Sequence, residues 1–399
     1  MRMTTETTGL WRQPKAIALL LAASLTVMAN ATISPALAGL EQEFADVPDA
    51  GFLVRLLVTA PSLGVMLTAP LAGWLTDRAG RRRVLLAGIW LFILCGTAGV
   101  CLPDLHLMLA SRFGLGVAVA LIMTAQTALI GDYFTGARRQ ALTGLQISAR
   151  NFGGLVFIGL AGLAATQSPR LPFLIYGLAV VCLYTVWRFA PEPDRTGSAQ
   201  AQAEGAGHPA WLALVIAVSA LQMLTNGLFF MMPTQLPFFF ASQGLNSALM
   251  TGAGLGLLSL CGGLTALAYA RFKGALPHAA VFAAGYGALA LGFAVLAQEG
   301  SPALSLTGAM AVGVGYATVS PGFVAIALAL APAGRRGTAG AILTASVFCG
   351  QFLSPFASTP AIAQWGYGGA FGAAAAVLAL MAAAALAAAL HTARRRAAA

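Results

Sequence analysis

Ionisable side chains are few in this chain, and their placement limits the chemistry that it could perform. Lys, Arg, Asp and Glu together make up 9% of the 399 residues. Arg112 and Arg150 lie inside long apolar segments, whereas every Asp and Glu lies in a polar stretch or at the end of an apolar segment. Isolated guanidinium groups can bind anions or hydrogen-bond acceptors, but acid–base or metal chemistry needs clustered carboxylates, histidines or thiolates. We therefore expect a binding protein and no enzyme, with no metal and no cofactor.

Amide and aromatic side chains lie inside the same apolar segments at helical spacing. At steps of three or four residues, Arg112 shares a helix face with Gln126, and Arg150 shares one with Gln146. Polar groups are costly in hydrocarbon, so these faces should turn toward a cavity or another helix. The candidate substrate-contacting residues are Asn30, Arg112, Gln126, Gln146, Arg150, Asn151, Gln222, Asn226, Phe230 and Tyr316. Each amide could instead bond a neighbouring helix, Phe230 could serve packing alone, and Arg112 could have a structural partner.

A compact polar stretch, Gly73–Arg83, separates two apolar segments and holds four arginines and one aspartate. Gly80 permits a tight turn because it has no Cβ. Asp77 can offset the positive end of a neighbouring helix. The arginines could also do no more than anchor the loop at a membrane surface.

The elements that carry these residues must be membrane-spanning helices. Apolar residues make up 59% of the chain, and its mean hydropathy is +0.82. Runs of about 20 apolar residues, enough to cross a hydrocarbon core, recur throughout. We predict an all-α polytopic membrane protein with twelve transmembrane helices at about 16–38, 52–76, 84–102, 105–130, 140–166, 171–190, 210–240, 248–270, 277–298, 303–331, 337–363 and 367–390. The first segment could be a secretory signal, but its length favours a retained span.

The polar stretch 191–208 divides the predicted spans into two six-helix halves, 1–190 and 209–399. With a cytoplasmic N-terminus, 18 of the 22 Lys and Arg residues fall on the cytoplasmic side, and the others are Arg55, Arg112, Arg150 and Arg170. This distribution follows the positive-inside rule and predicts that both termini are cytoplasmic. It also accounts for the net charge of +10 without any nucleic-acid partner.

The two halves carry signs of a duplication. A shift of 197 residues without a gap superimposes Arg138-Arg139 on Arg335-Arg336, Gly153 on Gly350 and Gly88 on Gly285. The same shift moves the Gly73–Arg83 stretch onto a segment with Arg271 and Lys273 but without the aspartate and the glycine of the turn. We therefore predict a six-plus-six repeat whose second polar hinge has decayed.

The two sets of six spans and the Gly73–Arg83 stretch resemble the major facilitator superfamily. The family's loop pattern, G-x-L-[AT]-D-[RK]-x-G-[RK]-[RK]-x-x-[LIV], is met by Gly73, Leu75, Asp77, Arg78, Gly80, Arg81, Arg82 and Leu85. The resemblance implies that Gly73, Asp77, Arg78, Gly80, Arg81 and Asp132 form a conformational latch. In this latch Arg81 would bridge Asp77 to Asp132, and Asp77 would face a helix that begins near Gly337.

Two further patterns bear on the branch of the family. Arg112 with Gly116 and Ala118 resembles the family's Arg-x-x-x-Gly-x-Ala pattern. Drug-efflux antiporters commonly have Gly-Pro-x-x-Gly-Gly in the fifth helix, where this chain has Asn151-Phe152-Gly153-Gly154 and no proline. The resemblance therefore favours an efflux-type transporter without assigning antiport.

The expected function is alternating-access transport of a small organic solute, neutral or anionic, because the spans hold arginines but no carboxylate that would attract a cation. Export is favoured, and the alternative is an uptake permease or facilitator for a nutrient such as a vitamin-like aromatic heterocycle. Proton coupling would need a site near a membrane face. A membrane-embedded enzyme and a transport-dead sensor have less support. We expect a monomer in the bacterial cytoplasmic (inner) membrane, with the solute and the lipid bilayer as its partners.

Overall fold

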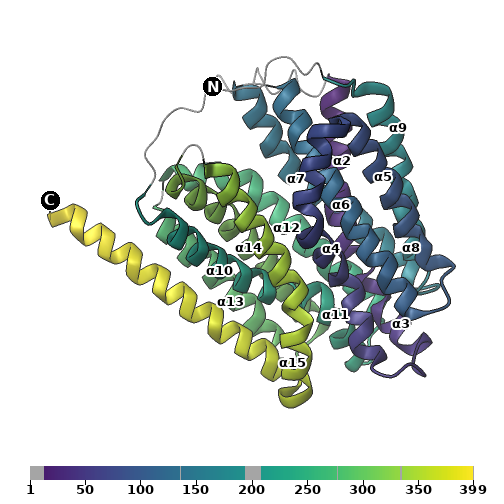
Figure 1. Cartoon of the computed structure of the whole chain (residues 1–399). Coiled ribbons are helices and arrows are strands. Elements are labelled where there is room, and N and C mark those ends of the chain that lie inside the picture. Colours follow the sequence, from purple (N-terminus) through teal and green to yellow (C-terminus); the bar gives the residue numbers. More distant parts are fainter. Residues whose placement is uncertain (1–12, 135, 194–207, 276, 333–334, 399) are drawn as a thin grey trace. The chain divides into compact units, whose positions relative to one another are not determined.

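The computed structural model describes residues 13–134, 136–193, 208–275, 277–332 and 335–398, and nearly all of them are helical (Figure 1). Within these ranges eleven helical segments are long and apolar enough to cross a membrane. The last, α15 (Arg336–Ala398), contains Gly366 with φ 69° and ψ 179°, so it consists of two helices joined at a bend. Counted this way, the described residues supply the twelve segments that hydropathy predicts. The all-helical, polytopic fold class is confirmed.

Two compact units divide the described residues. Unit 1 comprises Met1–Ala201 with Phe240–Gly252, and unit 2 comprises Gln202–Phe239 with Ala253–Ala399, each as far as its residues are described. Most of the predicted linker 191–208 lies outside the described residues. The division into halves 1–190 and 209–399 therefore stays a prediction.

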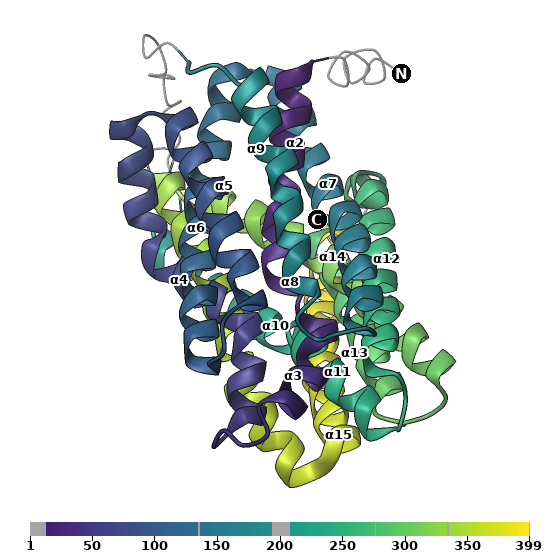
Figure 2. The ribbon, with the colours of Figure 1, turned by 90° about the vertical axis from the view of Figure 1, so that its right-hand side faces the viewer.

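Unit 1 is a helical bundle in which α6 packs against α4 and α5, while α2 packs against α7 and α9 (Figure 2). Its elements are α2 (Pro14–Ala31), η2 (Ser34–Ala36), α3 (Leu37–Glu43), α4 (Ala50–Ala79), α5 (Arg81–Thr97), η3 (Ala98–Val100), α6 (Leu105–Tyr133), α7 (Gly136–Ala165), α8 (Pro172–Ile175), η4 (Tyr176–Leu178) and α9 (Ala179–Phe189).

Unit 2 is a second bundle, in which α13 packs against α14 and α15, and α10 packs against the same two helices. Its elements are α10 (Trp211–Phe229), α11 (Met231–Ser242), α12 (Ser247–Ala275), α13 (His278–Leu296), α14 (Pro302–Leu330) and α15. The end of α11 and the start of α12 group with unit 1. The second helix of α15 lies at the edge of unit 2 (Figure 1).

The first and seventh predicted spans are broken helices. Pro35 has no N–H to bond the carbonyl four residues earlier, and the chain there changes from α2 through the 3₁₀ turn η2 to α3. Helix α10 ends at Phe229, and α11 begins at Met231. Pro233 lies in α11, beyond the break that follows Gln222 and Asn226.

The helix bounds support the 197-residue repeat. Shifted by 197, the bounds of α6 become 302–330, which are those of α14, and the start of α4 becomes residue 247, the start of α12. The close helix contacts repeat as well. A Cβ added to Gly116 would overlap the carbonyl oxygen of Pro61, and one added to Gly313 would overlap that of Leu258, 197 residues further on in both cases. The two units thus share a backbone frame.

Candidate functional site

The Gly73–Arg83 stretch forms the end of α4 and the turn into α5. Gly80 ends one helix and precedes the next with φ 101° and ψ 139°, a conformation that L side chains rarely adopt. A Cβ at this position would also lie 3.0 Å from Oε1 of Glu192. The turn therefore requires glycine for both its backbone angles and its close approach.

The structure brings Arg81 and Asp132 together. Their side chains form an ion pair between the start of α5 and the last turn of α6, and they are 26% and 11% exposed. Asp77 is exposed in the last turn of α4, and the guanidinium of Arg78 lies 4.6 Å from the ring of Trp74. A contact of Asp77 with the helix near Gly337 would join the two units, and it stays a prediction.

Several contacts around this turn were not predicted from the sequence. Arg82 donates from Nη2 to the carbonyl of Trp187 at 2.8 Å, and its backbone N–H points to Oε1 of Glu192 at 3.4 Å. The hydroxyl of Tyr133 donates to the carbonyl of Pro191. These bonds tie the turn and the end of α6 to the last turn of α9 and to the segment that follows it. Their partners are 58 to 110 residues apart, so no local pattern could indicate them.

A second ionic cluster lies at the other end of the unit 1 helices. Arg170 donates from Nε to Oε1 of Glu43 at 2.6 Å and from Nη1 to the carbonyls of Leu102 and Val100 at 2.7 and 3.3 Å. This one side chain joins α3, the end of η3 and the segment before α8. The sequence singled out Arg170 only as a basic residue in a predicted external loop.

Arg112 is completely buried in unit 1. It donates from Nη2 to the carbonyl of Gly96 at 2.8 Å, and its guanidinium lies 4.7 Å and 4.9 Å from the rings of Phe173 and Tyr176. These contacts connect α6 with α5, α8 and η4. They favour the alternative in which Arg112 has structural partners.

Arg150 has a different environment on α7. Its side chain is half-buried, and its Nε is buried without a hydrogen-bond partner among the residues that the structure describes. No ion pair to Arg150 occurs within the described ranges either. One turn later, Gly153 approaches Ser24 of α2, so this side of α7 faces α2. Among the described residues Arg150 therefore has no ion-pair partner, although it lies in a helix of apolar character.

The amide side chains of unit 1 differ in their hydrogen-bond partners and in their burial. Gln126 is buried and donates from Nε2 to the carbonyl of Leu19 in α2, but its Oε1 is buried without a partner in the described part of the chain. Asn151 donates to the carbonyl of Ile147 in its own helix at 3.0 Å. Gln146 is buried on α7, and Asn30 is half-buried in the last turn of α2.

In unit 2 the structure brings three candidate residues together. Asn226 is fully buried, accepts at Oδ1 from the hydroxyl of Tyr316 at 2.8 Å and donates to the carbonyl of Gln222 at 2.9 Å. Phe229 stacks on Tyr316 with ring centroids 3.9 Å apart. Gln222 is 3% exposed, and its Oε1 has no partner among the described residues. Phe230 is buried at the break between α10 and α11. The group combines a free hydrogen-bond acceptor with an aromatic stack.

Within the described ranges no three His, Cys, Asp or Glu side chains come together in a group that could bind a metal ion. The described residues are suited to binding by hydrogen bonds and aromatic contact, and neither Arg112 nor Arg150 has an ion-pair partner among them.

Comparisons with known proteins bear on the whole chain. A family model described as Major Facilitator Superfamily matches residues 19–276. The chain is 30% identical over 124 residues to Multidrug resistance protein 2 of Bacillus subtilis, a match that covers 31% of each. It is 26% identical over 132 residues to Quinolone resistance protein NorA of Staphylococcus aureus, covering 33% of this chain and 34% of the relative. The chain thus spans about a third of the length of the curated relatives it matches.

Solved structures match over a longer range. A D-xylose-proton symporter has 16% sequence identity and a TM-score of 0.73, covering 92% of this chain and 96% of that one. A POT family transporter in complex with 5-aminolevulinic acid has 12% identity and a TM-score of 0.77, covering 94% and 96%. At these identities the likeness concerns the fold alone.

Proposed function

Because the chain belongs to the major facilitator superfamily, we propose that it moves a small neutral or anionic organic solute across the bacterial cytoplasmic membrane by alternating access. The chain is an integral membrane transporter of that family; its solute, direction and coupling are the subject of the proposal. We further infer that it acts as a monomer with both termini in the cytoplasm, an orientation supported by its basic residues.

Arg150 carries the proposal about the solute. Its guanidinium is half-buried in α7 and has no ion-pair partner among the described residues. An uncompensated charge in hydrocarbon is costly, so it should face a solute or a water-filled path. A cationic solute would be repelled there, whereas a carboxylate or a carbonyl would gain a charge-assisted hydrogen bond. Gln222, Asn226 and Tyr316 add neutral hydrogen-bonding groups.

Export is the favoured direction. Its support is the likeness to proteins named for multidrug and quinolone resistance. The alternative is uptake of a planar nutrient such as a vitamin-like aromatic heterocycle, and it is favoured by the stacked pair Phe229 and Tyr316. Either direction uses the same two units.

We infer that Gly73, Asp77, Arg78, Gly80, Arg81 and Asp132 act together as a conformational latch. The support for this latch is the ion pair between Arg81 and Asp132, which joins two helix ends and is mostly shielded from water. The bond would hold one state of the transporter and break as the halves rock. Any proton coupling would use a site near a membrane face, because the carboxylates that form ion pairs in the described ranges lie at helix ends.

The decisive experiment is transport of a labelled solute panel in proteoliposomes, with anionic, neutral and cationic members of similar size, with and without a pH gradient. We expect anionic and neutral solutes to move. Arg150→Gln should lower transport of the anionic members by about tenfold, the loss of one charge-assisted hydrogen bond, and leave neutral members less affected. Arg188→Gln is the matched control, because Arg188 is an exposed arginine in the last turn of α9.

Accumulation of cationic dyes that is driven by a pH gradient and unchanged in Arg150→Gln would contradict the proposal. If empty vesicles accumulate the solute and preloaded vesicles do not release it, the direction of transport is uptake and the proposal of export is contradicted. A reporter fused after Ala399 tests the orientation, since it should be active only in the cytoplasm.

A further inference from the structure

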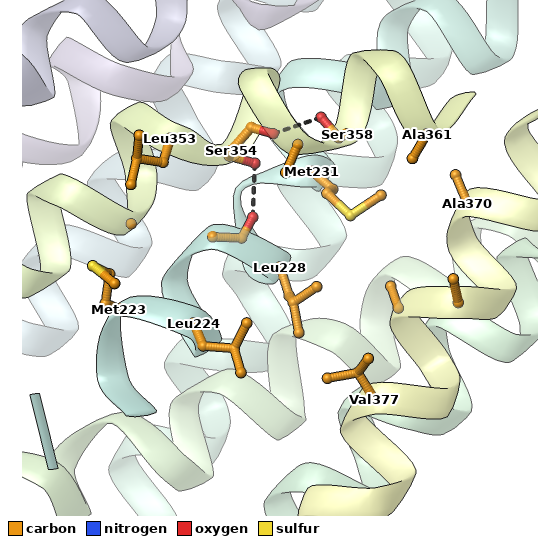
Figure 3. Close-up of a pocket in the computed structure, with 15 residues that line it drawn as sticks. Met223, Leu224, Leu228, Met231, Leu353, Ser354, Ser358, Ala361, Ala370 and Val377 are labelled. Carbon is orange, nitrogen blue, oxygen red and sulfur yellow. Dashed lines mark hydrogen bonds between the residues drawn. The ribbon is translucent and has the colours of Figure 1, made fainter. Parts of the chain in front are cut away.

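A cavity of about 320 Å³ lies in unit 2, on the side of α10 that faces α15 (Figure 3). Its walls come from α10, from the start of α11 and from both helices of α15, and they include Leu224, Leu228, Met231, Leu353, Ser354 and Val377. Neither Gln222 nor Asn226 lines it, although both lie on α10. The cavity is therefore separate from the polar group described above.

The walls of the cavity are apolar in effect. Its only polar side chains are Ser354 and Ser358, and both hydroxyls already donate to backbone carbonyls. Ser354 donates to Gly227 at 2.7 Å, and Ser358 donates to Ser354 at 2.8 Å (Figure 3). Cavities without free polar partners stay dry and bind hydrocarbons.

The repeat explains how the cavity arises. In unit 1 the side chain of Tyr176 reaches across to α2, where its hydroxyl donates to the carbonyl of Ala29 at 3.2 Å. The residue 197 positions later is Ala373, which lines the cavity and has no side chain to cross the gap to α10. The shift also pairs Phe157 with Ser354 and Leu160 with Ala357.

The helices themselves stay close in both units. Gly153 approaches α2 at Ser24, and its counterpart Gly350 approaches α10 at the carbonyl of Met223. The cavity thus follows from smaller side chains on the same frame, not from helices that have moved apart.

We propose that this cavity binds one acyl chain of a membrane phospholipid. Its rim residues Leu224, Leu353 and Val377 are 45%, 43% and 37% exposed, so the cavity opens on the surface of helices that span the membrane. The medium at that surface is hydrocarbon, which carries no charge and needs no hydrogen bond. A bound chain would give the walls the close contacts that a void lacks.

The size of the cavity suits a single acyl chain but not a helix from a second copy of the protein. A helix with its side chains is about 10–12 Å across. The inner walls include Ser354 and Ala370, each only 3% exposed, so a helix lying on the rim could not reach them. One flexible acyl chain can extend between α10 and the two helices of α15.

Native mass spectrometry of the purified transporter, washed stepwise to remove lipid, tests the proposal. Wild type should retain one phospholipid when the others are gone. Ala373→Phe, which fills the cavity, should lower that retained fraction at least about tenfold, as expected for removal of a site. Ala379→Phe is the control, because Ala379 is exposed on the same helix and does not line the cavity.

A second measurement covers the case in which Ala373→Phe does not fold. Ala357→Leu introduces, near the rim, the leucine that unit 1 carries at the paired position 160. It should also lower the retention of phospholipid. A phospholipid with a photoreactive group in its acyl chain should crosslink to 223–231, 353–361 or 370–377. Retention that is equal in all variants, crosslinks confined to other segments, or displacement of the lipid by a transported solute would each overturn the proposal.

Discussion

In unit 1 the helix ends are held by ion pairs, whereas the positions 197 residues later carry neutral and aromatic side chains. Arg170 bonds Glu43 in unit 1, and the shift of 197 places Tyr367 of unit 2 and Phe240, which groups with unit 1, at these positions. Tyr367 instead packs its ring against Phe239, with centroids 5.7 Å apart. At the other end, the counterparts of Arg81 and Asp132 are His278 and Ala329, which cannot form an ion pair of that kind.

The same difference runs through the interior of the two units. Unit 1 buries Arg112 and half-buries Arg150, while the buried polar side chains described in unit 2, such as Gln222, Asn226 and Gln235, are uncharged. The glycine contacts that set the helix spacing are nevertheless repeated. In this fold the close contacts between helix backbones are therefore kept in both units, while the charges of the buried side chains differ. We infer that charge-dependent steps of transport reside in unit 1.

The largest effect is expected where the units agree. Gly116→Ala and Gly313→Ala should each destabilise the protein by about 1–3 kcal/mol or more, because the new methyl group overlaps a carbonyl oxygen of the neighbouring helix. Thermal unfolding in detergent measures the loss. Gly159→Ala and Gly287→Ala are the controls, since nothing lies within 4 Å of a Cβ at either position. A loss in only one unit would break the equivalence of the frames.

The next effect concerns the latch, where the units differ. Arg81→Gln and Asp132→Asn should each slow transport several-fold while the protein stays folded, because both remove the same ion pair. A double-mutant cycle should give a coupling energy on the order of 1 kcal/mol. His278→Gln, the unit 2 counterpart of Arg81→Gln, should leave the rate unchanged. Unaltered transport in both unit 1 variants would show that the pair only anchors a loop.

The fold was predictable because hydropathy is a property of long segments. The predicted spans agree with the helices to within a few residues at most ends, and the bend at Gly366 falls between the last two predictions. The break after Phe229 was not predicted, although Pro233 was a visible signal.

The contacts of the candidate site were harder to predict from the sequence than the fold. Helical spacing places Asn226 on a face, but it does not indicate that Tyr316 of another helix donates to it. The contact of Arg112 with two rings depends on the path of η4 and α8, which periodicity does not encode. Side-chain partners that are far apart in sequence are set by packing, and one sequence carries no record of them.

A smaller effect is expected at the outer cluster of unit 1. Arg170→Gln and Glu43→Gln should show a coupling of about 0.2–1 kcal/mol, as for pairs that water partly reaches, and it should shrink in high salt. Tyr367→Leu, at the counterpart of Arg170, should cost about 0.5–1.5 kcal/mol from its aromatic contacts. Its effect should not depend on salt. Melting curves at low and high salt separate the two kinds of contact, and equal salt dependence would contradict the distinction.

The smallest effect is expected at a pair of helix caps. The backbone N–H groups of His106 and Leu107 bond the carboxylate of Asp104 and lower its pKa below the ordinary 3.8. Because the folded pKa is the lower one, this stabilisation is present above pH 3.8 and is lost as the pH falls through the folded pKa.

The counterpart of Asp104 is Ser301, which caps α14 by accepting from the N–H of Leu304 at 3.3 Å and does not titrate. Asp104→Ser should therefore leave stability at neutral pH nearly unchanged and remove part of the loss in acid. Ser301→Asp should introduce the same acid sensitivity into unit 2. Melting temperatures from neutral to strongly acidic pH measure both, and identical acid profiles for the variants and the wild type would refute the assignment.

The 197-residue offset recurs at four helix starts, because α2, α4, α5 and α6 begin 197 residues before α10, α12, α13 and α14. The spacing of these helices is therefore equal in the two sets, whereas charged residues such as Asp132 and Arg170 are paired with the neutral Ala329 and Tyr367. We infer that the fold depends more strictly on helix spacing than on charge at these positions. The residues of α2, α4, α5 and α6 have counterparts 197 positions later, so libraries of reciprocal swaps can be built from this one sequence without any relative to guide them.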